Sequence, residues 1–99
     1  QEKIDEMKRV QALSAPVKFE VNGSELIIMF PKDFSGKLLT GEVVLYYPAD
    51  KNKDVKENFS IQDEPLKLAI PSKNRGLHWL HLSWKDGDVT YYFEKKFFI

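Results

Sequence analysis

The chain has 99 residues, the length of one small domain, and its 15 Lys and Arg balance its 15 Asp and Glu. A formal net charge of zero offers no basic surface to a phosphate backbone, so we expect no nucleic-acid binding. Cysteine is absent, which excludes disulfide bonds and thiolate chemistry, and the longest apolar runs are strand-sized and far short of a membrane span.

Residues 1–14 carry the one convincing helical pattern of the chain. Ile4, Met7 and Val10 recur at helical spacing among charged residues, and Pro16 ends the pattern because it disfavours helix at the residue before it. Two interpretations stay open: an amphipathic helix packed on the domain, or the end of a longer helix that leads out of a membrane. Because the chain begins with Gln inside a helical pattern, we expect a removed N-terminal membrane anchor before it.

Residues 15–99 form the second predicted unit, in which apolar and polar side chains alternate as they do in β-strands. Turn residues separate about six or seven strands, which we predict over residues 17–21, 25–30, 41–47, 59–61, 66–70, 77–84 and 89–99. Residues 49–58 are predicted as a loop or an edge strand, and residues 31–37 and 71–76 as loops. This pattern favours a mainly β fold, an immunoglobulin-like antiparallel β-sandwich, with a small barrel as the alternative.

Residues 22–24, "NGS", are predicted as a hairpin turn in which Asn22-Gly23 suits positive φ, and Asp86-Gly87 suits the centre of a two-residue type I′ turn. The second turn would pair Trp84 with Val89 and divide the C-terminal hairpin into two faces. The predicted core face holds Leu80, Leu82, Trp84, Val89, Tyr91 and Phe93. The predicted outer face holds Trp79, His81, Ser83, Thr90, Tyr92 and Glu94.

The two histidines, His78 and His81, are three residues apart on the same predicted strand, so they point to opposite faces. They therefore form no joint metal site, and we predict no cofactor. Weak copper binding by His81 alone stays open as an alternative. Sequence motifs of the common enzyme classes are absent, so we identify no catalytic residue and expect no enzyme activity.

An aromatic surface is the strongest functional candidate. The predicted strand 41–47 lies beside the C-terminal hairpin, and the residues expected to share the outer face are Val44, Tyr46, Trp79, His81 and Tyr92. Such patches mark interaction sites, which predicts a docking face for a partner protein. Two alternatives stay open: the helix or the loops cover the patch, or Trp79 and Tyr92 stack on a small ligand such as a carbohydrate.

Three stretches of the sequence carry a family resemblance: "FPKDFSGKLLTGEV", the Gly76-to-Trp84 strand "GLHWLHLSW", and the closing "YYFEKKFFI". Together with the charged helix, they resemble the soluble part of a FixH-family protein, over nearly the whole chain. These stretches are features of fold and surface, and none is a catalytic motif.

The resemblance implies a bacterial inner-membrane protein with one N-terminal transmembrane helix and a periplasmic domain. FixH proteins are encoded beside a cbb3-type cytochrome oxidase and a copper-transporting P-type ATPase. The implied function is non-catalytic assistance in assembly of the oxidase, with oxidase subunits or the copper-transporting ATPase as partners. The family supplies no catalytic residue to transfer to this chain.

Overall fold

A computed structural model of the chain describes residues 2–71 and 75–99, so residues 72–74 of the predicted loop 71–76 lie outside the described residues. The elements in chain order are α1 (Glu2–Gln11), β1 (Lys18–Asn22), β2 (Glu25–Met29), η1 (Lys32–Phe34), β3 (Leu38–Tyr46), η2 (Lys51–Lys53), β4 (Val55–Gln62), β5 (Leu66–Ala69), β6 (Leu77–Asp86) and β7 (Val89–Phe98).

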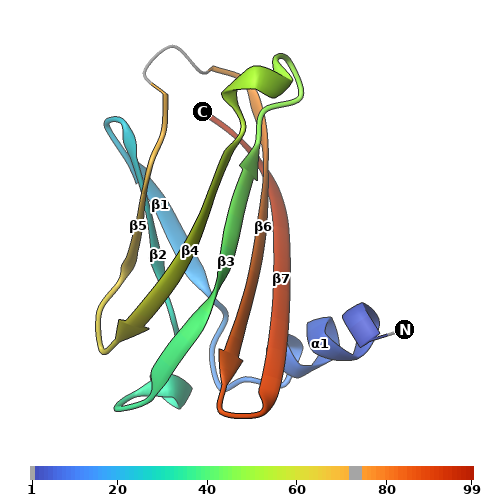
Figure 1. The fold of residues 1–99 in the computed structure, drawn as a ribbon, viewed down its shortest axis with the longest axis vertical. Coiled ribbons are helices and arrows are strands. Elements are labelled where there is room, and N and C mark those ends of the chain that lie inside the picture. The colour runs from blue at the N-terminus through green and yellow to red at the C-terminus, as the bar shows by residue number, and fades with distance from the viewer. Residues whose placement is uncertain (1, 72–74) are drawn as a thin grey trace.

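The strands form two antiparallel sheets that face each other (Figure 1). One sheet has the order β1-β2-β5, and the other has the order β4-β3-β6-β7. No strand pairs across the two sheets in the described ranges, so the fold is a sandwich and not the alternative barrel. The prediction of a mainly β, immunoglobulin-like sandwich with a short N-terminal helix is confirmed.

Strand boundaries differ from the prediction mainly around β3 and β4. β3 begins at Leu38, three residues before the predicted start, and β4 extends the predicted strand 59–61 in both directions. The two strands pair continuously from Leu38 opposite Gln62 to Leu45 opposite Val55. This backbone pairing turns the polar residues 55–58 into part of an edge strand, one of the two predicted outcomes for that segment.

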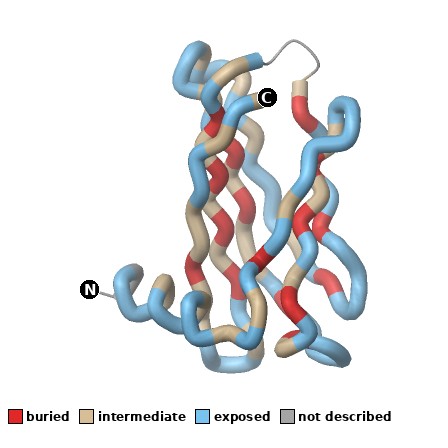
Figure 2. The backbone as a smooth tube through the Cα atoms, turned by 180° about the vertical axis from the view of Figure 1, so that it is seen from behind, coloured by how far each residue is buried: buried red, intermediate tan, exposed pale blue. Residues whose placement is uncertain are grey.

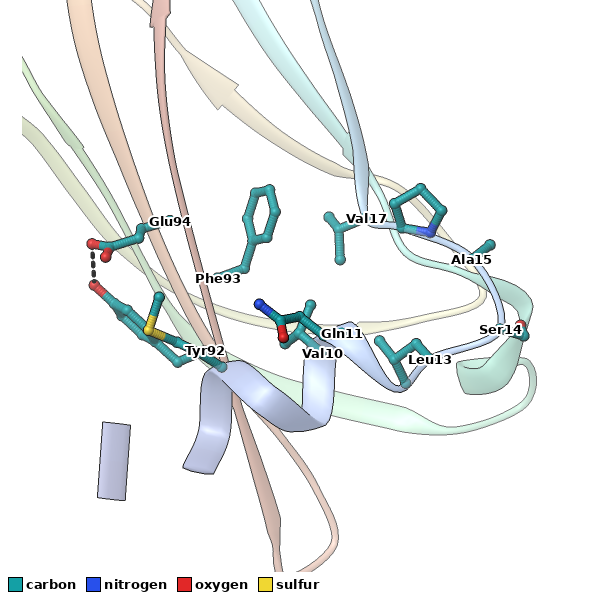
Figure 3. A pocket seen from close by; sticks show the side chains of 11 residues that line it. Val10, Gln11, Leu13, Ser14, Ala15, Val17, Tyr92, Phe93 and Glu94 are labelled. Atoms are coloured by element: carbon teal, nitrogen blue, oxygen red, sulfur yellow. Dashed lines mark hydrogen bonds between the residues drawn. The ribbon is translucent and has the colours of Figure 1, made fainter. Parts of the chain in front are cut away.

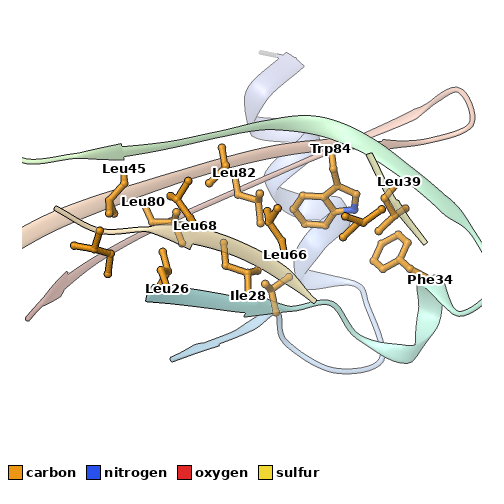
Figure 4. Close-up of a cluster of buried hydrophobic side chains, with 14 residues drawn as sticks. Leu26, Ile28, Phe34, Leu39, Leu45, Leu66, Leu68, Leu80, Leu82 and Trp84 are labelled. Atoms are coloured by element: carbon orange, nitrogen blue, oxygen red, sulfur yellow. The ribbon is translucent and has the colours of Figure 1, made fainter. Parts of the chain in front are cut away.

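The core lies between the sheets, where buried residues alternate with half-buried or exposed ones along β2, β3, β5 and β6 (Figure 2). Leu26, Leu66 and Leu68 of the three-stranded sheet face Leu80 and Leu82 of the other (Figure 4). Each of these side chains is at most 6% exposed. Burial of one such side chain stabilises the fold by roughly 1.5–3 kcal/mol.

An aromatic cluster closes one end of the core. Trp84 is fully buried, stacks on Tyr91 at 5.4 Å between ring centroids, and meets Phe30 edge to face at 5.0 Å. Phe34 also meets Trp84 edge to face, at 5.8 Å. The predicted loop 31–37 thus contains the short helix η1, which inserts Phe34 into the core. Val89, predicted as core, is 43% exposed because it lies beside the turn at the end of the hairpin.

The second hairpin turn is displaced by one residue from the prediction, whereas the first lies within the predicted turn 22–24. Asp86 pairs with Val89, so the two central residues are Gly87 and Asp88, and in the first hairpin they are Gly23 and Ser24. Only the glycine of each turn has a positive φ (63° for Gly87), which matches a type II′ turn and not type I′. The prediction of turn type for the second hairpin was therefore wrong. Moving a two-residue turn by one position shifts the pairing by two residues, so the predicted faces are unchanged.

α1 packs against β7 and leaves the end of the sandwich at an angle (Figure 1). The Arg9 side chain donates a hydrogen bond to the Thr90 carbonyl at 2.8 Å. In the segment that follows the helix, Ser14 donates hydrogen bonds from its backbone N–H and its hydroxyl to the Asp33 carboxylate. The helix therefore lies on the sandwich, as one interpretation predicted. No helix in residues 2–71 and 75–99 is long and apolar enough to cross a membrane.

Gly41 of β3 should tolerate no side chain. A Cβ atom there would lie 2.0 Å from the Ser83 carbonyl oxygen and 2.8 Å from the Trp84 Cα, both backbone atoms that cannot yield locally. We expect Gly41→Ala to lower the free energy of unfolding by about 3 kcal/mol, measured by urea denaturation. Thr40→Ala, an exposed change on the same strand, is the matched control, and equal losses in the two variants would contradict the packing argument.

Asp33 should make the fold sensitive to acid. Its hydrogen bonds with Ser14 hold the pKa of the carboxyl below its ordinary value of 3.8. A carboxyl whose pKa is lowered by folding stabilises the fold above its unfolded pKa and loses that contribution as the pH falls through the folded value. We expect Asp33→Asn to destabilise at neutral pH, with the difference from wild type shrinking as the pH falls below 3.8, measured by thermal unfolding. A constant difference at all pH values would count against this role.

Candidate docking site

The outer face is the surface of the four-stranded sheet that points away from the core, and three cross-strand rows form its centre. Val44 lies beside His81, which lies beside Glu94. The neighbouring rows are Tyr46, Trp79 and Lys96 on one side, and Glu42, Ser83 and Tyr92 on the other. A hollow of about 240 Å³ is lined by Glu42, Val44, Tyr46, His81, Ser83 and Tyr92. The structure thus brings together all five residues predicted for the site.

His81 is the centre of an aromatic group. Its ring centroid lies 4.5 Å from Trp79, 4.8 Å from Tyr46 and 5.9 Å from Tyr92, with each pair edge to face. Edge-to-face geometry places the positive edge of one ring against the negative face of another, which is a favourable contact. The rings hold each other in fixed orientations, so a partner would meet an ordered surface.

A polar network joins His81, Tyr92 and Glu94. The Tyr92 hydroxyl lies 2.6 Å from Nδ1 of His81 and donates to Oε2 of Glu94 at 3.2 Å. Because a carboxylate only accepts, a hydroxyl that donates to it accepts from the Nδ1–H of His81. Nε2 of His81 lies 3.6 Å from the same Glu94 oxygen, a distance at which a protonated imidazole forms an ion pair. The burial of Tyr92 and then the nearby Glu94 charge raise the pKa of its phenol.

Tyr92 departs from the prediction in its exposure. Only 5% of this residue is accessible, although it was expected on an exposed patch. α1 packs on β7, and Met7 and Val10 line a second hollow together with Tyr92 (Figure 3). The helix therefore covers the predicted patch at its Tyr92 end, as one of the alternatives stated. A carbohydrate could not stack on both Trp79 and Tyr92, because the second ring is covered.

Two residues that sequence reasoning missed extend the exposed surface at its other end. Leu77 pairs with Phe98 on the outer face, and they are 36% and 77% exposed. With the half-exposed Tyr46 and Trp79 they form the open part of this face, which we call the aromatic patch: Tyr46, Leu77, Trp79 and Phe98. The Lys96 ammonium lies 4.8 Å from the Trp79 ring centroid, a cation–π contact. Strand parity, continued to both strand ends, is the sequence signal that could have found Leu77 and Phe98.

His78 points into the core, opposite to His81, as strand parity predicts. It is fully buried, with its ring centroid 4.9 Å from Tyr47 and 5.8 Å from Phe97. Its Nδ1 lies 3.0 Å from the Gly76 carbonyl oxygen. No cluster of three metal-ligating side chains occurs within the described part of the chain. A copper ion at His81 would have to displace the Tyr92 hydroxyl from Nδ1 or Glu94 from the side of Nε2.

Comparison with known proteins identifies no family. No protein-family model matches the chain, and no curated protein matches it. A crystal structure of the chicken interferon gamma receptor alpha chain is similar at 15% sequence identity, with a TM-score of 0.47. The similarity covers 84% of this chain and 48% of the receptor chain, so this chain spans about half the length of that protein.

Tyr92 should resist ionisation at alkaline pH. The chain has 4 tyrosines, and burial beside Glu94 raises the pKa of this one above its ordinary value of 10.0. A phenol whose pKa is raised by folding contributes stability below its unfolded pKa and loses it as the pH rises beyond that value. In a titration followed by phenolate absorbance, we expect the Tyr92 phenol to be the last tyrosine to ionise before the protein unfolds. Tyr92→Phe should therefore remove the ionisation step that occurs at the highest pH. If the variant instead removes a group that titrates near 10.0, the network does not protect this hydroxyl.

Proposed function

We propose that this domain is a non-catalytic docking module that binds a partner protein through the outer face of its four-stranded sheet. The ordered aromatic group around His81 carries the proposal, because Trp79 and Tyr46 are fixed by ring contacts and yet stay partly accessible. Rigid aromatic side chains lose little conformational entropy on binding and are enriched among the residues that dominate binding energy.

The shape and the charges of the face favour a protein over a small molecule. Small-molecule pockets usually enclose roughly 300–1,000 Å³, whereas the hollow beside His81 measures about 240 Å³. Charged side chains flank the aromatic centre, among them Lys96 over Trp79 and a Lys56–Glu42 ion pair at 3.5 Å. An apolar centre with a polar rim is the usual anatomy of a protein–protein interface.

The resemblance to FixH-family domains supplies the candidate partner. Under this proposal the domain lies in the periplasm, tethered to the bacterial inner membrane by an N-terminal anchor that precedes the chain. It would dock onto subunits of a cbb3-type cytochrome oxidase, or onto a copper-transporting P-type ATPase, and assist assembly of the oxidase. It needs no cofactor for this role, because docking rests on side-chain contacts alone.

Trp79→Ala should abolish co-purification with the oxidase. Truncation of a central aromatic anchor costs about 2 kcal/mol or more, which weakens binding roughly 30-fold. Binding is measured by pull-down of oxidase subunits with the membrane-anchored protein and by titration with the isolated subunit. Val21→Ala, which shortens an exposed apolar side chain on the other sheet, is the control and should bind normally. Circular dichroism verifies that both variants fold, and normal binding by folded Trp79→Ala would refute the docking face.

A further inference from the structure

We propose that the free edge of β7 is a dimer interface, in which the β7 strands of two copies pair antiparallel across a two-fold axis at Lys95. β7 is the last strand of the four-stranded sheet, and within residues 2–71 and 75–99 no strand pairs with its other edge. α1 lies beside the lower part of this strand (Figure 1), with Arg9 on the Thr90 carbonyl. The segment from Tyr92 to Phe98 is the part that would receive a second strand. This inference is independent of the proposed function.

The hairpin fixes which backbone groups of β7 point outward. Asp86 and Val89 flank a two-residue turn, so they form a hydrogen-bonded pair, and Gly76 and Ile99 exchange two hydrogen bonds at the other end. Odd-numbered residues of β7 therefore bond to β6, and even-numbered residues direct N–H and C=O away from it. The bond from Arg9 to the carbonyl of Thr90 agrees with this parity. Glu94, Lys96 and Phe98 thus present their backbone groups at the sheet edge.

The sequence of this edge is complementary to itself. With Lys95 on the axis, Glu94 of one copy lies opposite Lys96 of the second copy, and the reverse pair repeats the contact. Each pair can exchange two backbone hydrogen bonds, and each joins opposite charges on the outer face, a favourable cross-strand pair. Moving the register by one step in either direction would instead place Glu94 opposite Glu94 or Lys96 opposite Lys96. The axis at Lys95 is therefore the register that the charges select.

The same register accounts for the most exposed apolar side chain. Phe98 is 77% exposed, and the pairing places it opposite Tyr92 of the second copy. Beside Tyr92 lies a hollow of about 390 Å³ at the junction of β7 with the helix and the segment that follows it (Figure 3). Its apolar lining includes Met7, Val10 and Phe93. The ring of Phe98 from one copy would enter this hollow of the other, once on each side of the axis.

Lys95 makes an unfavourable contact in the proposed interface. On the axis it meets its own copy, and like charges directly opposite each other destabilise a pair of strands. Its side chain is exposed, so the long aliphatic stem can carry the ammonium to water. Lysines on edge strands also commonly serve to block association. Substitution separates the strand-paired dimer from simple blocking of the edge. In the dimer, removal of Lys95 strengthens association and removal of Lys96 weakens it, whereas removal of either lysine would strengthen association if both only blocked the edge.

Sedimentation of the chain between about 1 µM and about 1 mM tests the dimer through four variants. We expect Lys96→Thr to weaken association and Lys95→Thr to strengthen it, each about tenfold. Lys96→Glu should give a monomer, because it faces Glu94 of the second copy, and the double change Glu94→Lys with Lys96→Glu should restore the dimer. Circular dichroism confirms that each variant keeps its fold.

A cysteine cross-link locates the axis independently. The chain has no cysteine in its sequence, so a single one reports on its own neighbours. Residues opposite each other in a non-hydrogen-bonded antiparallel pair have Cα atoms about 4.5 Å apart, which a disulfide can span. We expect Lys95→Cys to form a covalent dimer rapidly under mild oxidation. Glu57→Cys, exposed on β4 at the opposite edge of the same sheet, is the control and should stay monomeric.

Three results would overturn the proposal. A wild-type chain that stays monomeric up to about 1 mM has no such interface. Stronger association in both Lys95→Thr and Lys96→Thr would show that the lysines only block the edge. Equal cross-linking of Lys95→Cys and Glu57→Cys would place no axis at residue 95. None of these results bears on partner docking through Trp79, so the two proposals fail separately.

Discussion

The two-residue turn at Gly87 and Asp88 fixes the register of the β6–β7 hairpin, and most other features of the molecule follow from that register. Side chains alternate along each strand, so the turn decides which side chains lie side by side on each face: Trp84 beside Tyr91 toward the core, and His81 beside Glu94 on the outer face. The same turn decides which backbone groups of β7 bond to β6 and which point to the sheet edge. The cross-strand neighbours on both faces and the backbone groups at the edge are thus consequences of one local conformation, which Gly87 permits through its positive φ.

The N-terminal helix decides how much of the outer face is accessible. It packs on β7 next to Tyr92, and the contact between Ser14 and Asp33 fixes the segment that leads from the helix to β1. Covering Tyr92 removes one aromatic ring from the surface and places its hydroxyl in the network with His81 and Glu94. The apolar surface that remains lies at the far end of the sheet, where Leu77 and Phe98 pair.

The face and the edge of β7 offer two kinds of contact that overlap only at Phe98. A protein bound to the outer face would contact side chains such as Trp79, whereas a second β7 strand would use backbone groups at the edge. Because the proposed axis is perpendicular to the sheet, both copies in a dimer would present their outer faces on the same side. A partner with two matching sites could then bind both copies, and linked sites gain affinity through effective concentration.

The sequence alone determined the fold class, the hairpin faces and the grouping of Val44, Tyr46, Trp79 and His81, because alternation and turn residues are local signals. It could not determine that Phe34 completes the core, that β3 starts at Leu38, or that Tyr92 is covered. Each of these depends on contacts between segments far apart in the chain: η1 against Trp84, β3 against β4, and the helix against β7. Local pattern fixes the direction in which a side chain points, and only tertiary packing decides what covers it.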